Sequence, residues 1–361
     1  MTLAAAVPAG AWTGGGDAEM MTVDPLSDAN WDALVAEHPR RTIFHGSAWA
    51  RVLRDTYGHR PFYFARFEGR QLAAALPVME VSSPLTGLRG VSLPFTDFCP
   101  ALGSARGGGA DLYQMAIECG RQRRWKYLEC RSLDGVWKGS QPSLSFYVHR
   151  VDLGGDRERL FQRLEGAVRR GVRKAEREGV KIDFDSGEQS MRTFFRLHCG
   201  TRRRHGLPPQ PWRFFANIQR HLISAGRGFI ATARLGDKPL AASVFFHDGR
   251  QALYKFGASD YAFQQMRPNN LVMWAAMNYC LERGLAALHL GRTSLSNAGL
   301  RHFKLGLGAD EEEVHYAKYD FVSQQFVRDV DRVDGWFNRV FALLPLPLLR
   351  LSGAVLYPHL S

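Results

Sequence analysis

Three apolar runs of strand length follow one another in the second half of the chain. They cover residues 228–235, 240–247 and 252–258. Short polar turns separate them, Gly236-Asp237 after the first run and Asp248-Gly249 after the second. Runs of this length with Gly-Asp and Asp-Gly turns are typical of an antiparallel meander. The pattern therefore predicts three sequential strands at the centre of this half.

A helix and a further strand are predicted after the meander. The apolar pattern of residues 271–281 ends at Gly284, and Asn269 is the candidate cap of this helix. Residues 287–290 then form a short predicted strand that ends beside Arg292. A helix N-terminus and basic side chains at the ends of elements suit an anionic ligand. We therefore expect an α/β platform that binds such a ligand.

The first half of the chain shows a similar order of elements. Leu128-Glu129-Cys130-Arg131-Ser132 and His289-Leu290-Gly291-Arg292-Thr293-Ser294 occupy matching places in the two halves. This order predicts an internal repeat of one α/β unit. The predicted elements of the first half are a hairpin (62–67 and 72–81), a strand (91–95), a helix (110–119) and a strand (125–130).

A strongly basic helix is predicted between the halves, over residues 156–178. Apolar residues recur every four positions along it and make one stripe. Arginine and lysine occupy much of the remaining surface. The stripe consists of Leu160, Leu164, Val168 and Val172.

Length and composition set the domain organisation that we expect. A chain of 361 residues, 45% apolar and 23% charged, can bury two cores. We predict a disordered leader at 1–24, an N-terminal domain at 25–147, a C-terminal domain at 148–325 and a helical segment at 326–361. The expected fold class is α/β, with two tandem units whose mixed central sheets are flanked by helices.

Charge and cysteine content limit the partners and the cell compartment that we expect. A net charge of +12 suits a polyanion such as RNA, a nucleotide-linked substrate or an acidic membrane face, or it reflects a solvated basic surface. The five cysteines form no C-x-x-C pair, which favours a reduced, cytoplasmic protein. No histidine pair has the spacing of a metal motif, so we expect no metal site.

The C-terminal segment contains an interrupted apolar stretch. Pro345, Pro347 and Arg350 break residues 340–357, and no window reaches the length of a spanning helix. Residues 331–361 are therefore expected to pack on the second domain or to lie at the inner membrane surface, without crossing it.

An ordered series of motifs resembles FemAB-like proteins over roughly residues 30–345. The resemblance extends to the exosortase/PEP-CTERM-associated branch of that group, through Phe44-His45 and Ser92-Leu93-Pro94-Phe95-x-Asp97. The other motifs, in chain order, are Arg169-Arg170-Gly171-Val172-Arg173-Lys174-Ala175, Thr201-Arg202-Arg203-Arg204-His205-Gly206-Leu207-Pro208, the hairpin 241–258 with Tyr254, Pro268-Asn269-Asn270-Leu271, Gly291-Arg292-Thr293 and Phe303-Lys304-x-Gly306.

The resemblance implies two tandem GNAT-like domains and an acyl- or aminoacyl-transferase. Its acceptor would be an amino group of a cell-envelope or exopolysaccharide precursor. Acyl transfer needs a group that stabilises an oxyanion and a place for the proton of the nucleophile. The candidate catalytic residues are Lys304, Tyr254 and Arg292. The candidate substrate-binding residues are Arg170, Arg173, Thr201, His205, Asn269, Asn270 and Asp97.

The expected co-substrate is acyl-CoA or aminoacyl-tRNA, and no permanently bound cofactor is expected. Residues 264–270 stand where a GNAT enzyme carries its glycine-rich pyrophosphate loop, yet they contain no glycine. This departure puts ordinary CoA binding in question. Aminoacyl-tRNA would not need the loop, and the basic charge would suit tRNA as a partner.

Two other functions remain open from the sequence. One is a catalytically inactive FemAB-like module that binds a polysaccharide precursor. The other is an RNA-binding protein that uses the arginine-rich segment, although it lacks RNP-type aromatic motifs.

Overall fold

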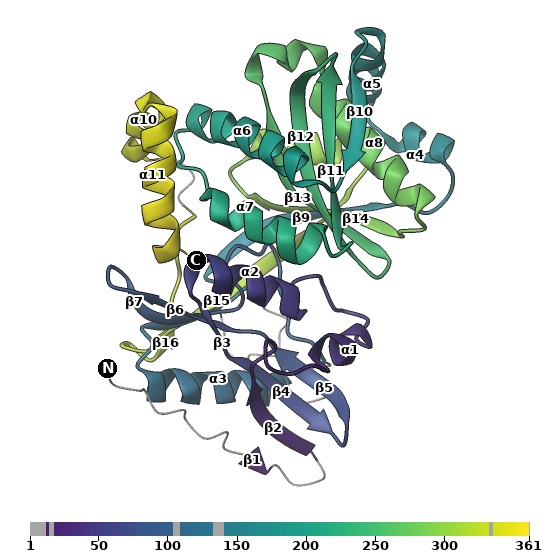
Figure 1. Ribbon diagram of the computed structural model, residues 1–361. Helices are drawn as coiled ribbons and strands as arrows, with labels where there is room; N and C mark the ends of the chain where they lie inside the picture. Colours follow the sequence, from purple (N-terminus) through teal and green to yellow (C-terminus); the bar gives the residue numbers. More distant parts are fainter. Residues whose placement is uncertain (1–11, 14–17, 104–108, 133–140, 332–334, 361) are drawn as a thin grey trace.

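The computed structural model describes residues 12–13, 18–103, 109–132, 141–331 and 335–360. A large mixed sheet crosses both halves of the molecule, and helices flank it (Figure 1). The expected α/β class with mixed sheets is confirmed. The strand order is β10 (Lys181–Asp185), β11 (Gly228–Leu235), β12 (Lys238–Asp248), β13 (Gln251–Ser259), β14 (Ala287–Ser294), β9 (Leu144–Asp152), β15 (Asp310–Asp320), β8 (Tyr127–Cys130), β7 (Gly87–Val91), β6 (Met79–Ser83) and β3 (Arg60–Pro61), and β16 (Gln325–Phe326) pairs with β15.

The predicted meander is confirmed as strands β11, β12 and β13. They pair antiparallel in sequence order. Gly236 and Gly249 stand in the two tight turns with φ of +56° and +55°. Side chains with a Cβ adopt this backbone region at a cost, which explains glycine at both positions.

Helix α8 (Pro268–Glu282) connects β13 to the parallel strand β14. It starts at Pro268, not at Asn270, so the predicted cap at Asn269 is wrong. The N-cap position belongs to Arg267, which has a left-handed backbone with φ of +57°. Proline is favoured in the first helical turn because its missing N–H has no partner there.

The basic segment after β9 forms two helices and not the one that was expected. They are α4 (Arg157–Arg163) and α5 (Gly166–Arg177). Leu164 is extended and only 2% exposed, and the N–H of Glu165 bonds to the carbonyl of Gly306. Burial of Leu164 and this tertiary hydrogen bond together stabilise the extended backbone more than one further helical turn would.

The N-terminal half contains a second, four-stranded sheet. Its order is β1 (Trp12–Thr13), β2 (Ala18–Val23), β4 (Tyr63–Glu68) and β5 (Gln71–Leu76). Because residues 18–23 form β2 and pair with β4, the expected leader at 1–24 is too long. The remainder of that leader lies largely outside the described residues.

Both halves use a helix to join two parallel strands. Helix α3 (Gly109–Arg123) lies between β7 and β8, as α8 lies between β13 and β14. The halves differ before that helix, where β6 and β7 stand in place of the single long β13. The expected boundaries at 147/148 and 325/326 fall inside β9 and β16, and β15 pairs with both β9 and β8. The division into two domains therefore stays a prediction, because one continuous sheet runs through both halves.

The largest hydrophobic core is shared between the halves. It contains Trp31, Trp49 and Leu53 from the N-terminal half together with Phe214 and Phe246 from the C-terminal half. The rings of Trp49 and Phe214 meet edge to face, with centroids 5.9 Å apart. The helices of this core are α1 (Trp31–Ala36), α2 (Ser47–Tyr57), α6 (Glu188–Arg204) and α7 (Trp212–Ile218).

The C-terminal segment forms two short helices that lie beside α6 at one side of the molecule (Figure 1). They are α10 (Trp336–Leu343) and α11 (Leu346–Leu356), separated at Pro345 as the sequence predicts. Arg202 donates to the hydroxyl of Tyr357 at 3.0 Å, and Leu349 is fully buried. In the described part of the chain, no helix has both the length and the apolar character needed to cross a bilayer.

Candidate active site

The candidate site begins where strands β13 and β14 part. They pair only over Gln251–Leu253 with Ala287–His289. The residues that follow on each strand, 254–257 and 290–292, line a cleft of about 580 Å³. Clefts of this size are typical of small-molecule sites. The end of α6 and the loop after β7 complete its walls, through His198, Thr201, Arg202, His205, Phe95, Thr96 and Asp97.

An ion pair between the two halves lies in this cleft. Lys255 Nζ on β13 is 2.6 Å from Asp97 Oδ2, in the loop after β7. The side chains are 5% and 21% exposed. Burial opposes ionisation of Asp97, but the ammonium of Lys255 holds its pKa below the ordinary value. Burial lowers the pKa of Lys255 despite the carboxylate beside it. The opposite charges of Asp97 and Lys255 therefore compensate each other where the two halves meet.

Lys304 supplies a second buried ammonium. It lies on α9 (Ala298–Leu305) and is 3% exposed. Its Nζ donates to the carbonyls of Gly291 and Arg292 at 2.9 and 3.0 Å. Burial lowers its pKa to about 8, although the carboxylate of Asp97 acts in the opposite direction. Lys304 therefore loses its charge in mildly alkaline solution, at a lower pH than an exposed lysine.

A tyrosine connects two arginines beneath the cleft. Arg292 Nη1 donates to Tyr316 Oη at 3.1 Å, and this hydroxyl donates to the backbone carbonyl of Asp97 at 2.5 Å. Arg131 donates to the carbonyl of Thr96 at 2.8 Å. The guanidinium carbons of Arg292 and Arg131 lie 5.4 and 5.8 Å from the Tyr316 ring centroid. The arginines at matching places in the two halves thus meet on one ring.

Tyr254 contributes a neutral hydroxyl to the cleft. Burial raises its pKa to about 12, and Ser243 hydrogen-bonds to it. A Cβ built on Gly257 would lie 1.8 Å from the Tyr254 hydroxyl oxygen. The Tyr254 ring therefore occupies the space that the side chain of a larger residue at position 257 would need. At physiological pH the phenol remains a hydrogen-bond donor.

Thr201 and His205 line the same cleft from α6 and its C-terminal end. Thr201 Oγ1 donates to the carbonyl of Ser259 at 3.2 Å, and the N–H of Ser259 donates back at 3.1 Å. This exchange joins α6 to the end of β13. Burial and the neighbouring arginines Arg204 and Arg202 lower the pKa of His205.

Four candidate residues lie outside the lining of this cleft. Arg170 and Arg173 lie on α5, where Val168 and Val172 bury the opposite face. The Arg173 guanidinium covers the ring of Phe161 at 5.5 Å. The expected cleft with Arg170 and Arg173 beside Lys304 is therefore wrong, because the amphipathic helix directs its basic face away. The other two are Asn269, whose Nδ2 is 3.4 Å from Ser259 Oγ, and Asn270, which packs against Gly171.

The sequence alone did not identify three residues at or beneath this cleft. Lys255 stands in an apolar strand, and a lysine in such a run is a usable signal for a functional position. Arg131 stands out in the sequence only as the partner of Arg292 in the repeat. Tyr316 had no signal, since its role depends on β15 passing beside β9 and β8.

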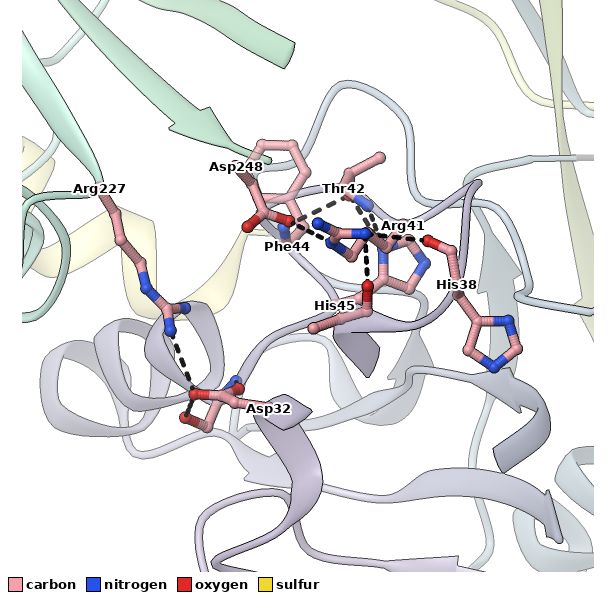
Figure 2. Close-up of polar contacts among 10 residues, drawn as sticks. Asp32, His38, Arg41, Thr42, Phe44, His45, Arg227 and Asp248 are labelled. Atoms are coloured by element: carbon pink, nitrogen blue, oxygen red, sulfur yellow. Dashed lines mark hydrogen bonds and ion pairs between the residues drawn. The ribbon is translucent and has the colours of Figure 1, made fainter. Parts of the chain in front are cut away.

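A second cavity of about 310 Å³ meets the first at Asp97 and Gly291. Residues 39–44 of the N-terminal half form one wall. Figure 2 shows Arg41 of this wall paired to Asp248 at 3.1 Å. It also shows Arg227 paired to Asp32 of α1, at 3.5 Å. Asp97 and Gly291 therefore line both cavities, and each cavity is built from both halves.

The described residues contain no group of three or more His, Cys, Asp or Glu that could hold a metal ion. None of the five cysteines forms a disulfide. In place of a glycine-rich loop, residues 261–266 form a 3-10 turn that leads into α8.

Comparison with known proteins identifies a domain and a fold. Residues 162–312 match the family described as an acetyltransferase (GNAT) domain. Comparison with curated protein sequences gives no significant match.

Three solved structures share the fold over most of the chain. The crystal structure of FemX superposes with a TM-score of 0.68 and 15% identity, covering 84% of this chain and 98% of FemX. The C-terminal domain of a putative lysylphosphatidylglycerol synthetase from Agrobacterium fabrum gives 0.53 and 13%, with 92% and 96% covered. A tandem GNAT protein from the clavulanic acid biosynthesis pathway gives 0.52 and 14%, with 84% and 98% covered. Residues 162–312 therefore match a GNAT acetyltransferase domain, and the chain as a whole has a fold similar to those of FemX and the tandem GNAT protein.

Proposed function

We propose that this protein transfers an acyl or aminoacyl group to an amino group of a cell-envelope or exopolysaccharide precursor. The observation that carries the proposal is the charge cluster of Asp97, Lys255, Arg292 and Lys304 in the larger cleft, of which Asp97 also lines the second cavity. Two cavities that share a charged lining residue suit two substrates that must meet at one bond.

The reaction needs no oxidant or reductant. The nitrogen lone pair of the acceptor attacks the acyl carbonyl carbon, and a C–N bond forms. The C–S bond of a thioester, or the C–O bond of an aminoacyl ester, breaks. One proton leaves the amine, and the departing sulfur or oxygen gains one. Negative charge develops on the carbonyl oxygen between these events, and fixed cations stabilise it.

The residues of the cluster have distinct proposed roles. Lys304 and Arg292 provide positive charge for a phosphate or for the developing oxyanion. Tyr254 donates a hydrogen bond from a phenol that stays protonated. Asp97 is neutralised by Lys255, so we assign it to substrate binding and orientation rather than to strong base catalysis. Thr201 and His205 complete the substrate-binding wall.

The donor is a CoA thioester or an aminoacyl-tRNA. The structure of the tandem GNAT protein represents its form without AcCoA, which associates that protein with a CoA thioester. The FemAB-like resemblance instead implies aminoacyl-tRNA. Residues 264–270 lack glycine, which favours the tRNA donor for this chain. We further propose that the protein works in the cytoplasm at the inner membrane surface, where an envelope precursor would be presented.

The test combines ligand identification with transfer assays. Mass spectrometry of ligands that co-purify with the protein identifies the donor or acceptor class. Purified protein is then incubated with acetyl-CoA, or with bulk aminoacylated tRNA, and the identified precursor. Attachment of the acyl group to the precursor amine is expected with one of the two donors.

Lys304→Ala and Arg292→Ala should lower transfer by about 100-fold, which is the effect of removing one oxyanion donor. Arg250→Gln, an exposed residue of the β12–β13 turn, is the matched control. Precursor binding that depends on Lys304, without transfer from either donor, would instead identify a binding module. That alternative has some support, since Lys304 already donates to two carbonyls and Lys255 is already paired.

A further inference from the structure

The two C-terminal helices cover α6 with one side and expose large apolar side chains on the other. Leu349 and Tyr357 are 0% and 7% exposed at the inner side. Leu343, Leu351 and Val355 are 85%, 60% and 57% exposed. Of the large apolar side chains that are exposed in the described residues, six lie in the short span 337–355. Such a concentration differs from the single exposed leucines of an ordinary surface.

The exposed residues follow helical spacing. Val340 and Leu343 are three positions apart on α10. Leu348, Leu351 and Val355 are three and four positions apart on α11. Residues at these spacings share one face of a helix, so each helix carries a continuous apolar stripe. The inner faces are already occupied by α6, and the stripes therefore lack a covering element among the described residues.

A cationic groove of about 650 Å³ lies beside α10. Arg196, Arg203 and Arg204 of α6 line it with Lys238 at the start of β12. Ala342 of α10, next to Leu343, lines it as well. Asp260 is the one acidic residue among the lining residues that the structure describes. The groove thus brings four cations to the edge of an apolar surface.

We propose that this face docks on an anionic lipid bilayer. The stripes of α10 and α11 enter the boundary between headgroups and acyl chains, and the groove binds headgroup phosphates. Amphipathic helices with basic residues beside an apolar face bind membranes in this way. An RNA would be attracted by the groove, but it would gain nothing from the exposed leucines. The inference deepens the proposed location and is independent of the transfer reaction.

Vesicle flotation of the full chain tests the proposal without donor or acceptor. The probes are vesicles of phosphatidylcholine alone and of phosphatidylcholine with phosphatidylglycerol. Wild-type protein should float with the anionic vesicles and lose binding as salt rises. The double variant Leu343→Ser/Leu351→Ser should bind roughly tenfold more weakly or worse, because the apolar area no longer leaves water. Arg203→Gln/Lys238→Gln should weaken anionic binding by roughly fivefold for each charge.

Matched controls distinguish membrane binding by this face from binding by any exposed apolar side chain or any positive charge. Val322→Ser changes an 86% exposed side chain in the turn between β15 and β16 and should bind as wild type. Arg250→Gln removes a charge at the other end of β13 from the groove and should also bind as wild type. Circular dichroism confirms that each variant is folded.

Three results would overturn the proposal. The first is that wild-type protein does not float with anionic vesicles. The second is that the leucine variant floats as well as wild type. The third is that tRNA binding, and not vesicle binding, is lost in Arg203→Gln/Lys238→Gln. Transfer activity on a precursor in solution would remain measurable in each case, so the two proposals fail separately.

Discussion

Lys304 lies in an environment that differs strongly from that of a surface lysine. Its ammonium is buried against two carbonyls, and its pKa falls to about 8. A lysine that titrates there is protonated at neutral pH and loses its charge in mildly alkaline solution. Such tuned groups are concentrated at functional sites.

We predict that transfer activity decreases as pH rises through about 8, because the proposed role of Lys304 needs its charge. Lys304→Arg should remove this decrease, since a guanidinium stays charged. The sign for stability is opposite. The folded-state pKa lies below the ordinary 10.5, so burial of the ammonium destabilises the fold below pH 8, and this penalty disappears as pH rises. A pH–rate profile of both proteins checks the prediction, and an identical alkaline limb in Lys304→Arg would contradict it.

The Asp97–Lys255 pair yields a second prediction at this scale. Asp97→Asn leaves the Lys255 ammonium buried without its counter-charge. Removal of one partner of a buried pair costs about 3–5 kcal/mol, and the partial exposure of Asp97 favours the lower end. The double variant Asp97→Asn/Lys255→Met should recover most of that loss. Urea unfolding of the single and double variants measures it, and additive losses would rule out the coupling.

At the scale of elements, the parting of β13 and β14 decides where the cleft opens. β13 is long enough to continue beyond its pairing with β14, and residues 254–257 then line the cleft. Tyr254 and Gly257 are coupled in this segment, because the phenol occupies the place of a Cβ.

We predict that Gly257→Ala destabilises the protein by about 1–3 kcal/mol, as overpacking does. Tyr254→Phe removes the clashing oxygen and should restore part of the stability in the double variant. Gly200→Ala is the control, since a Cβ at Gly200 on α6 meets nothing within 4 Å. It should be neutral or stabilising by up to about 1 kcal/mol. Thermal unfolding measures all three proteins, and equal losses for both glycine variants would refute the steric explanation.

At the scale of the whole molecule, the two halves share both a sheet and a core. β15 pairs with β9 through residues 310–316 and with β8 through 317–320. Trp49 packs on Phe214 across the halves and is fully buried. Separate domains with a polar interface would be expected to move independently, whereas this shared core resists such motion.

We therefore predict one cooperative unfolding transition for the full chain. Trp49→Ala should lower the stability by about 3–5 kcal/mol through loss of a large buried ring. Hydrogen exchange should then increase in both halves, including β12 and α7. Faster exchange in residues 18–132 alone would show that the halves unfold separately.

The local pattern of the sequence determined many of the strands, turns and helix ends of this protein. The turns at Gly236 and Gly249 and the apolar runs around them predict their elements because side-chain periodicity is a property of neighbours in sequence. The ordered motifs also single out Lys304, Arg292, Tyr254 and Asp97 from the sequence alone. Even the break at Pro345 follows from the chemistry of one residue.

Only the tertiary structure decided which of these residues meet. Asp97 and Lys255 are 158 positions apart and touch because the N-terminal loop closes over β13. Arg170 and Arg173 carry a motif yet lie away from the cleft, since burial of Val168 and Val172 sets the rotation of α5. Tyr316 joins two arginines because β15 runs between the halves. Contacts of this kind depend on how sheets and cores close over long separations, and residue spacing does not encode that closure.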